Sequence, residues 1–351
     1  MTPSGAGPRN QTHKAPDHHV RGFCAFRGGE RRRGRPLKTP SGETRRATNA
    51  TILSCARSIT RSSPRDTFLP KYLVTQSELP EEREARRGRT GKSSGETYAA
   101  TLCQIVADAE VTIVAPADDD APAFTIDDIQ RFDGVFLTGS PMHVYRETPA
   151  VARQLAFMRV VFASGVPSFG SCAGLQIAVA AAGGKVRRMP RRMEAGVARG
   201  IVATEAGSDH PLLAGRGRVW EAGAIHGDEV EVLPPDAVLL AGNSVTGVQA
   251  AEVRFTGGVF WGVQYHPELS LEEIAIALRA QADDLVEAGL AQDAGDVARQ
   301  AALLDRLHAE PDHAPTRWKL GVGDELAIEA NRRREICNFI AHLNTLRNKT
   351  G

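Results

Sequence analysis

The 351-residue sequence lacks several features that would assign it to particular protein classes. It contains no run of the ~18 apolar residues that a membrane-spanning helix requires, so we expect no membrane association. Its five cysteines are scattered and include no C-x-x-C pair, which argues against a disulfide framework or a zinc ribbon. This cysteine usage fits a reducing compartment, and we expect a cytoplasmic protein. Histidines and cysteines do not recur at metal-ligand spacing, so no metal site is expected.

Basic residues are concentrated at the start of the chain. Residues 1–70 contain 14 Lys and Arg against 4 Asp and Glu, whereas the whole chain has a net charge of only +1. The segment is rich in Ser, Thr, Gly and Pro and has no apolar periodicity that could build a core. We therefore predict that residues 1–68 form a disordered basic tail. A solvated tail, a nucleic-acid-binding arm, a targeting segment and a misjudged start site are the alternatives, and nucleic acid is expected as a partner only through this tail.

Residues 71–183 alternate between strand-like and helix-like segments. Helices are expected to start after Ser93, Thr125 and Thr148, each of which has the side chain of an N-cap residue. The alternation predicts an α/β fold, namely an open, twisted, mostly parallel sheet with helices on both faces. The charged segment 79–92 is expected to be an exposed loop. The expected strands cover residues 71–78, 110–119 and 132–141, followed by one near 166–171.

The character of the sequence changes after Gly184. Strand-like segments separated by Gly, Pro, Asn and Asp turns continue to about residue 268. Helices are then expected at about 270–288, 296–309 and 325–345. We divide the chain into the tail 1–68, an α/β domain 69–281 and a helical C-terminal extension 282–351.

The segment Val166–Ala180 reads as a short apolar strand, the residues Gly-Ser-Cys-Ala-Gly, and an apolar helix. Cys172 falls where the strand turns sharply into the helix, with Gly170 and Gly174 two residues to either side. Glycines leave no Cβ to clash in so tight a turn, and the start of a helix favours a thiolate. This is the pattern of a nucleophile elbow. The alternative is a buried structural cysteine in a tight turn.

Two further segments are suited to complete such a site. The apolar strand within Gly258–Glu268 ends in His266 and Glu268, and a thiol nucleophile needs a base that an acceptor orients. The segment Leu137–Pro141 ends an earlier strand in a loop whose backbone N–H groups can stabilise an oxyanion. Taken singly, these segments are equally well a surface histidine and a plain turn, and only their conjunction indicates a catalytic site.

Together these segments resemble the class I glutamine amidotransferases. G-S-C-A-G-L-Q matches the nucleophile motif of that family, Q-Y-H-P-E its His/Glu motif and T-G-S-P its oxyanion strand, and H-G-D-E-V (His226–Val230) is similar to the segment between them. The likeness covers about Tyr72–Gln281 and is greatest to stand-alone proteins that resemble the glutaminase domain of GMP synthetase. R-W-K-L-G-V-G-D-E-L and R-R-R-E-I-C-N-F-I-A-H-L resemble the C-terminal extension of that subgroup. The resemblance implies the flavodoxin-like fold of the family.

The resemblance also implies roles for individual residues. Cys172 would be the nucleophile, His266 the general base and acid, and Glu268 the residue that orients His266. The family's oxyanion loop is often Gly-Gly-Pro rather than Thr-Gly-Ser-Pro, so either Gly139 or Ser140 supplies one oxyanion N–H. The remaining implied site residues are Gly139 and Ala173 for the oxyanion hole, Gln176, Ser140 and Leu175 for substrate binding, and His226 and Asp228 for support of the site.

The function that follows is hydrolysis of the glutamine side-chain amide through a γ-glutamyl thioester. The products would be glutamate and ammonia for an acceptor, no metal or organic cofactor is required, and a synthetase or acceptor subunit is the implied partner. A homo-oligomer is a further expectation. One alternative is a γ-glutamyl peptide or amide hydrolase that uses the same Cys-His-Glu triad, and a lesser one is a non-catalytic regulatory domain. A phosphate loop at residues 86–94 is excluded, because Arg86 stands where that motif requires glycine.

Overall fold

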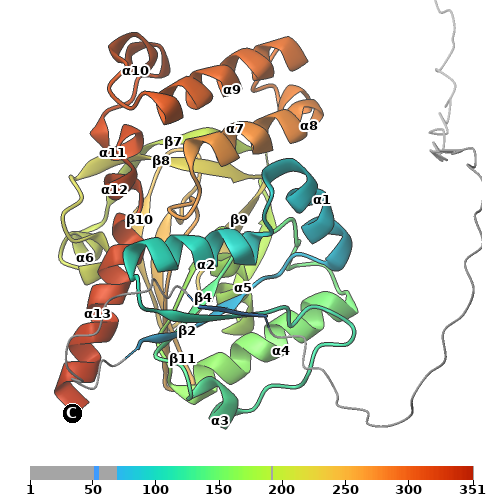
Figure 1. Cartoon of the computed structure of the whole chain (residues 1–351), viewed down its shortest axis with the longest axis vertical. Helices are drawn as coiled ribbons and strands as arrows, with labels where there is room; N and C mark the ends of the chain where they lie inside the picture. Colours follow the sequence, from blue (N-terminus) through green and yellow to red (C-terminus); the bar gives the residue numbers. More distant parts are fainter. Residues whose placement is uncertain (1–50, 55–68, 191–192, 351) are drawn as a thin grey trace, which may run out of the picture. The chain divides into compact units, whose positions relative to one another are not determined.

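A computed structural model of the chain describes residues 51–54, 69–190 and 193–350 (Figure 1). The predicted disorder of residues 1–68 therefore lies mostly outside the described residues. Within the described residues, the prediction of disorder is wrong at β1 (Thr51–Ser54), which pairs antiparallel with β3 (Glu110–Val114). The sequence T-I-L-S is rich in residues that favour strands, and β3 offers it an open edge. So short a segment has no periodicity that would have indicated a strand.

One mixed sheet forms the centre of the described chain and contains most of its strands. Besides β1 and β3 these are β2 (Lys71–Thr75), β4 (Gly134–Leu137), β5 (Ser168–Ser171), β7 (Glu194–Ala203), β8 (Val219–His226), β10 (Ala237–Gly242), β11 (Ala250–Phe255) and β12 (Gly258–Val263). Their order is β1-β3-β2-β4-β5-β12-β11-β10-β7-β8, and neighbours from β3 to β12 are parallel. The predicted α/β fold class is thus confirmed, and antiparallel strands extend its parallel centre on both sides.

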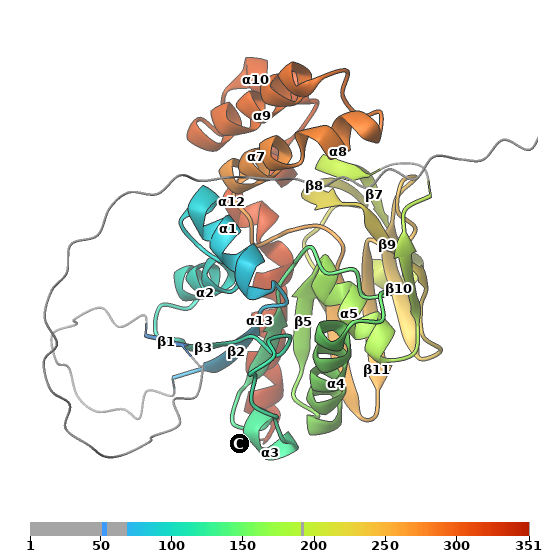
Figure 2. The same ribbon diagram turned by 90° about the vertical axis from the view of Figure 1, so that its right-hand side faces the viewer.

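Helices cover both faces of the parallel centre (Figure 2). Successive side chains of β2 point to opposite faces, so Tyr72 and Val74 pack in one core cluster and Leu73 in the other. The first cluster includes α2 (Ser94–Ile105) and α13 (Arg334–Thr350), and the second includes α3 (Ile126–Ile129), α4 (Pro149–Ser164) and α5 (Ala173–Ala181).

The expected helix starts are confirmed for α2, α3 and α4. The side chains of Ser93, Thr125 and Thr148 each accept a hydrogen bond from the backbone N–H three residues further on. Each thereby satisfies one of the N–H groups that a helix start leaves without a partner.

The predicted loop at residues 79–92 is instead a helix, α1 (Pro80–Thr90). It buries none of its residues, so the segment has no apolar stripe that would have predicted a helix. The helix begins with proline and acidic residues and ends with basic ones, which suits the helix dipole. Ion pairs hold it in place, among them Arg83 Nη2 at 2.6 Å from Asp118 Oδ2.

The C-terminal helices form a third core cluster, which includes Val197 of β7. They are grouped together on the β7–β8 side in Figure 2. The helical character expected after residue 270 is confirmed, and the helix over 314–320 was not expected. The helices of this cluster are α7 (Leu271–Ala280), α8 (Ala282–Glu287), α9 (Ala294–Ala309), α10 (Ala314–Leu320) and α11 (Asp324–Ala327), and α12 (Glu329–Arg332) follows without contributing to it.

The remaining elements are short. A second sheet pairs β6 (Lys185–Arg188) with β9 (Asp228–Val232), and α6 (Glu205–Ser208) and the 3₁₀ turn η1 (Pro211–Leu213) link β7 to β8. Cys103 of α2 is disulfide-bonded, which the scattered cysteines did not lead us to expect, whereas Cys172 and Cys337 are free thiols. Within the described ranges, no helix combines the length and the apolar character needed to cross a membrane.

Candidate active site

Cys172 lies in the sharp turn between β5 and α5. Its backbone has φ 52° and ψ −111°, a conformation that non-glycine residues rarely adopt and that costs about 1–3 kcal/mol. Its N–H donates to Val263 O of β12 at 2.8 Å, which ties the turn to the neighbouring strand. A Cβ on Gly174 would come within 2.6 Å of Leu137 O, so the turn can pack against β4 only with glycine at this position.

His266 and Glu268 follow the end of β12 and are buried next to this turn. His266 Nδ1 lies 2.8 Å from Glu268 Oε1. The backbone is held from two sides, because His266 N–H donates to Gly223 O at 2.8 Å and Thr101 Oγ1 donates to Glu268 O at 3.2 Å. We refer to Cys172, His266 and Glu268 as the Cys-His-Glu cluster.

The charges in this cluster favour a protonated histidine. Burial of the imidazole disfavours its charged form, but the negative charges of Glu268 and of the Cys172 thiolate outweigh burial and raise the pKa of His266 to about 10. His266 Nε2 has no hydrogen-bond partner among the described residues, and His266 lines the pocket above the sheet. The arrangement therefore favours an imidazolium at His266, next to Cys172.

Two backbone amides flank the cysteine. Gly139 follows β4, and a Cβ on it would lie 3.5 Å from the Cβ of Cys172. Ala173 is the first residue of α5, so its N–H has no partner within the helix. Within the described part of the chain, neither amide donates a backbone hydrogen bond outside the regular elements. Both are therefore available to an oxygen bound beside the thiol.

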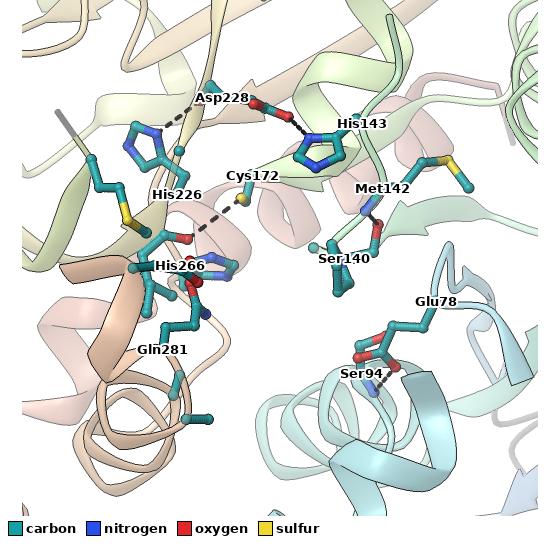
Figure 3. A pocket seen from close by; sticks show the side chains of 18 of the residues that line it. Glu78, Ser94, Ser140, Met142, His143, Cys172, His226, Asp228, His266 and Gln281 are labelled. Carbon is teal, nitrogen blue, oxygen red and sulfur yellow. Dashed lines mark hydrogen bonds and ion pairs between the residues drawn. The ribbon is translucent and has the colours of Figure 1, made fainter. Parts of the chain in front are cut away.

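The Cys-His-Glu cluster lines a pocket of about 860 Å³ (Figure 3). The pocket extends from Cys172 to helices that sequence analysis did not connect with the site. One face of α7 and α8 lines it, with residues recurring every three or four positions, and α1 lines it from another side. The lining residues of these helices are Arg86, Arg89 and Thr90 of α1 and Glu273, Ile276, Ala277, Ala280, Gln281, Asp284 and Glu287.

His226 and Asp228 meet at the junction of β8 and β9 and line the same pocket. His226 is buried, with Nε2 at 3.1 Å from Glu194 Oε2 and Nδ1 at 2.9 Å from Asp228 O. Asn243 and Gln249 also donate to Glu194; burial raises the pKa of Glu194, but these donors and His226 outweigh it and lower that pKa. Each ring nitrogen of His226 thus has a partner, which holds the imidazole in one orientation. The role of Glu194 was not predicted, because its partners are distant in sequence.

The predicted substrate-binding residues occupy different places. Gln176 lines the pocket, but its Nε2 donates to Asp228 O at 3.1 Å and to Gln264 Oε1 at 3.2 Å. Ser140 also lines the pocket, and its Oγ accepts from Met142 N–H at 3.3 Å. The side chain of Leu175 is fully buried in the core that faces α4, so this side chain does not reach the pocket.

Sequence analysis missed a histidine and a tyrosine at the edge of the pocket. His143 Nδ1 lies 2.6 Å from Asp228 Oδ2, and Tyr145 OH donates to Asp228 Oδ1 at 3.1 Å. Figure 3 shows this His143–Asp228 pair across the pocket from His266. Both residues follow T-G-S-P in the sequence, and no motif connects that segment with Asp228. Within residues 51–54, 69–190 and 193–350, no group of His, Cys, Asp and Glu is arranged to hold a metal ion.

The fold is that of an α/β enzyme of the amidotransferase and amidohydrolase type. The chain belongs to the glutamine amidotransferase class-I family, which matches residues 93–280. The family expected from the sequence is thereby confirmed. The matched residues include the strand-turn-helix around Cys172 and the end of β12, whereas α1 and the helices from α8 onward lie outside them.

Individual relatives cover the chain to different extents. A γ-glutamyl-L-1-hydroxyisopropylamide hydrolase from a Pseudomonas species is 33% identical over 278 residues, which is 78% of this chain and 92% of that protein. A glutamine-hydrolysing GMP synthase subunit from Methanoculleus marisnigri is 40% identical over 109 residues, which is 30% of this chain and 54% of that protein. A solved glutamine amidotransferase from Thermotoga maritima is 15% identical with a TM-score of 0.54, covering 79% of this chain and 98% of its own, and shows the shared fold.

Proposed function

We propose that this protein cleaves γ-glutamyl amides through a γ-glutamyl thioester on Cys172. The observation that carries the proposal is the Cys-His-Glu cluster in the wall of the pocket, with the free N–H groups of Gly139 and Ala173 next to Cys172. A thiolate, a protonated base held by a carboxylate and paired amide donors are what acyl transfer from an amide requires.

The reaction takes place in two steps. Cys172 Sγ attacks the γ-carbonyl carbon, and the N–H groups of Gly139 and Ala173 stabilise the oxyanion that forms. The C–N bond breaks as His266 Nε2 gives its proton to the leaving amine, which leaves the γ-glutamyl thioester. Water then gives a proton to His266 and attacks the thioester carbon. The C–S bond breaks, glutamate leaves, and the Cys172 thiolate is regenerated beside protonated His266.

The pocket supports a substrate whose amide nitrogen carries a substituent. A volume of about 860 Å³ is in the upper part of the range for sites that enclose drug-sized ligands, and a free amino acid fills only part of it. The walls that extend it, α1 and α8, lie outside the residues that the family shares. The Pseudomonas relative, which this chain covers almost completely, is a hydrolase of an N-substituted γ-glutamyl amide.

Hydrolysis of free glutamine is the second candidate. Family membership and the relative from Methanoculleus marisnigri favour it, and ammonia would then pass to a synthetase or another acceptor protein. The same cluster serves both reactions, so the cluster does not distinguish them. Whether the enzyme prefers glutamine or an N-substituted amide depends on the residues that line the pocket beyond the leaving nitrogen.

The test is release of glutamate from glutamine, γ-glutamylisopropylamide and γ-glutamylalanine. Cys172→Ala is the inactive variant, and Cys337→Ala, which removes the other free thiol of the described chain, is the matched control. We expect higher kcat/KM for the substituted amides than for glutamine, and loss of all turnover only in Cys172→Ala. Preference for glutamine would support the second candidate. Turnover retained in Cys172→Ala would disprove the thioester mechanism.

A further inference from the structure

A buried ion pair connects the last helix of the chain to the residue before His266. Glu335 of α13 is fully buried, and its carboxylate accepts from Arg216 Nε at 2.7 Å and from Arg216 Nη2 at 2.9 Å. The hydroxyl of Tyr265 also donates to Glu335 Oε1, at 2.8 Å. The side chain of Arg216 is almost completely buried and also pairs with Glu325 of α11.

Stability alone is a weak explanation for this pair. Removing two charges from water costs several kcal/mol, and well-packed apolar side chains often replace a buried ion pair without loss of stability. The pair instead fixes the position of the Glu335 carboxylate. A bidentate contact to Arg216 holds the Glu335 carboxylate in one orientation, and the acceptor it presents to Tyr265 is therefore fixed as well.

The position fixed in this way is next to the proposed base. Tyr265 directly precedes His266, whose own N–H is bound to Gly223 O at 2.8 Å. Helix α13 packs on the same part of the sheet through Phe339, whose ring centroid lies 5.7 Å from that of Trp261 in β12. Contacts from β8 and α13 thus restrain consecutive residues at the end of β12. His266 has little freedom to move relative to Cys172.

We propose that Glu335 and Tyr265 are positioning residues, through which α13 holds the His266 imidazole in line with the Cys172 thiol. Glu335 lies outside the residues matched by the family, so this support comes from the C-terminal helices and not from the shared domain. The effect on kcat rests on the proposed function. The effect on the reactivity of the thiol does not depend on which substrate is used.

Tyr265→Phe tests the proposal most cleanly, because it removes one hydroxyl and leaves the Arg216–Glu335 pair intact. Tyr72→Phe is the matched control, since Tyr72 is equally buried but lies on β2. Two measurements are made on the full chain. The first is kcat and KM for γ-glutamylisopropylamide, and the second is the rate at which iodoacetamide labels Cys172, followed by mass spectrometry of its peptide. Cys337 of α13 is an internal control for opening of that helix.

We expect Tyr265→Phe to lower kcat between about 5- and 100-fold with KM nearly unchanged, because a small displacement of the base affects proton transfer more than binding. Labelling of Cys172 slows as well, because a displaced imidazolium stabilises the thiolate less. Labelling of Cys337 in Tyr265→Phe stays at the wild-type rate. Tyr72→Phe keeps wild-type values of kcat, KM and Cys172 labelling. Glu335→Gln lowers kcat too, and the double variant is no slower than the slower single variant, because both changes break one link.

The proposal is overturned if Tyr265→Phe keeps kcat and Cys172 labelling within twofold of Tyr72→Phe. It is also overturned if Tyr265→Phe raises labelling of Cys337 in proportion to its loss of activity, since the hydroxyl would then serve only to keep α13 folded. If wild-type enzyme turns over no γ-glutamyl compound, the proposed function fails. The labelling comparison still decides whether α13 positions His266.

Discussion

The backbone of Gly139 lies against the imidazole of His266. A Cβ at residue 139 would come within 2.6 Å of His266 Cε1, closer than real side chains approach. The loop after β4 and the end of β12 therefore fit together only because residue 139 has no side chain. The same loop offers the N–H group that we assign to the oxyanion hole, so one glycine serves both the oxyanion and the position of the base.

Gly139→Ala should inactivate the enzyme without unfolding it. The added methyl group displaces the imidazole from the thiol, and a displacement of about 1 Å can cost roughly 100-fold in kcat. Gly247→Ala is the control, because a Cβ at residue 247 meets nothing within 4 Å. Steady-state kinetics and thermal unfolding of both variants check this. Full activity in Gly139→Ala would show that His266 does not need its present position.

The raised pKa of His266 should appear in the stability of the protein at alkaline pH. A histidine whose pKa rises from 6.5 to about 10 on folding contributes stability that is complete below pH 6.5 and lost as pH rises toward 10. Glu268→Gln removes one charge that raises this pKa, so we expect its stability to fall less between pH 6.5 and pH 10. Urea unfolding at both pH values, with the exposed Glu231→Gln as control, measures the difference. An equal fall in Glu268→Gln and wild type would contradict the assignment.

The stability of the protein at acidic pH should depend on Glu252 of β11. Burial disfavours its carboxylate, but hydrogen bonds from His210, Trp261 and Arg254 outweigh burial and lower the pKa of Glu252 from 4.5 to about 2. Its contribution, on the order of 3 kcal/mol, is present above pH 4.5 and lost as pH falls toward 2. Glu252→Gln should therefore be less stable at pH 7 and lose less stability on acidification. The free energy of unfolding is measured by chemical unfolding at pH 7 and pH 3, with the exposed Glu205→Gln as control. An equal loss of stability on acidification in Glu252→Gln and wild type would disprove the prediction.

The pocket wall formed by α7 should select the leaving group. Ala277 faces the pocket beyond the cluster, so Ala277→Phe fills the space we assign to the substituent on the amide nitrogen. We expect KM for γ-glutamylisopropylamide to rise at least about tenfold while KM for glutamine changes little. Ala298→Phe, on the exposed side of α9, serves as the control. If both substrates are affected equally, the leaving group does not lie along α7.

The sequence predicts the fold best where apolar periodicity and caps agree. The caps at Ser93, Thr125 and Thr148 locate three helices correctly, and the turn around Cys172 lies where glycine spacing places it. Helix α1 was missed because ion pairs rather than an apolar face hold it. Apolar periodicity predicts a helix from the face that it buries, and α1 buries none of its residues.

Within the site, sequence motifs indicate the residues that one element presents but not the contacts between distant elements. The bonds from His143 and Tyr145 to Asp228 connect segments more than 80 residues apart. The contact of Tyr265 with Glu335 spans 70 residues. Such pairs depend on how β9 and α13 pack on the sheet, which no local pattern contains. The pocket walls from α1 and α8 were missed for the same reason.

Mass spectrometry of the enzyme, quenched with acid during turnover of γ-glutamylisopropylamide, shows directly whether a thioester forms on Cys172. We expect a γ-glutamyl adduct on the peptide that contains Cys172. The adduct should disappear when substrate is exhausted and be absent in Cys172→Ala, which should release no glutamate. Steady release of glutamate by Cys172→Ala, or an adduct on any other residue, would contradict the thioester mechanism.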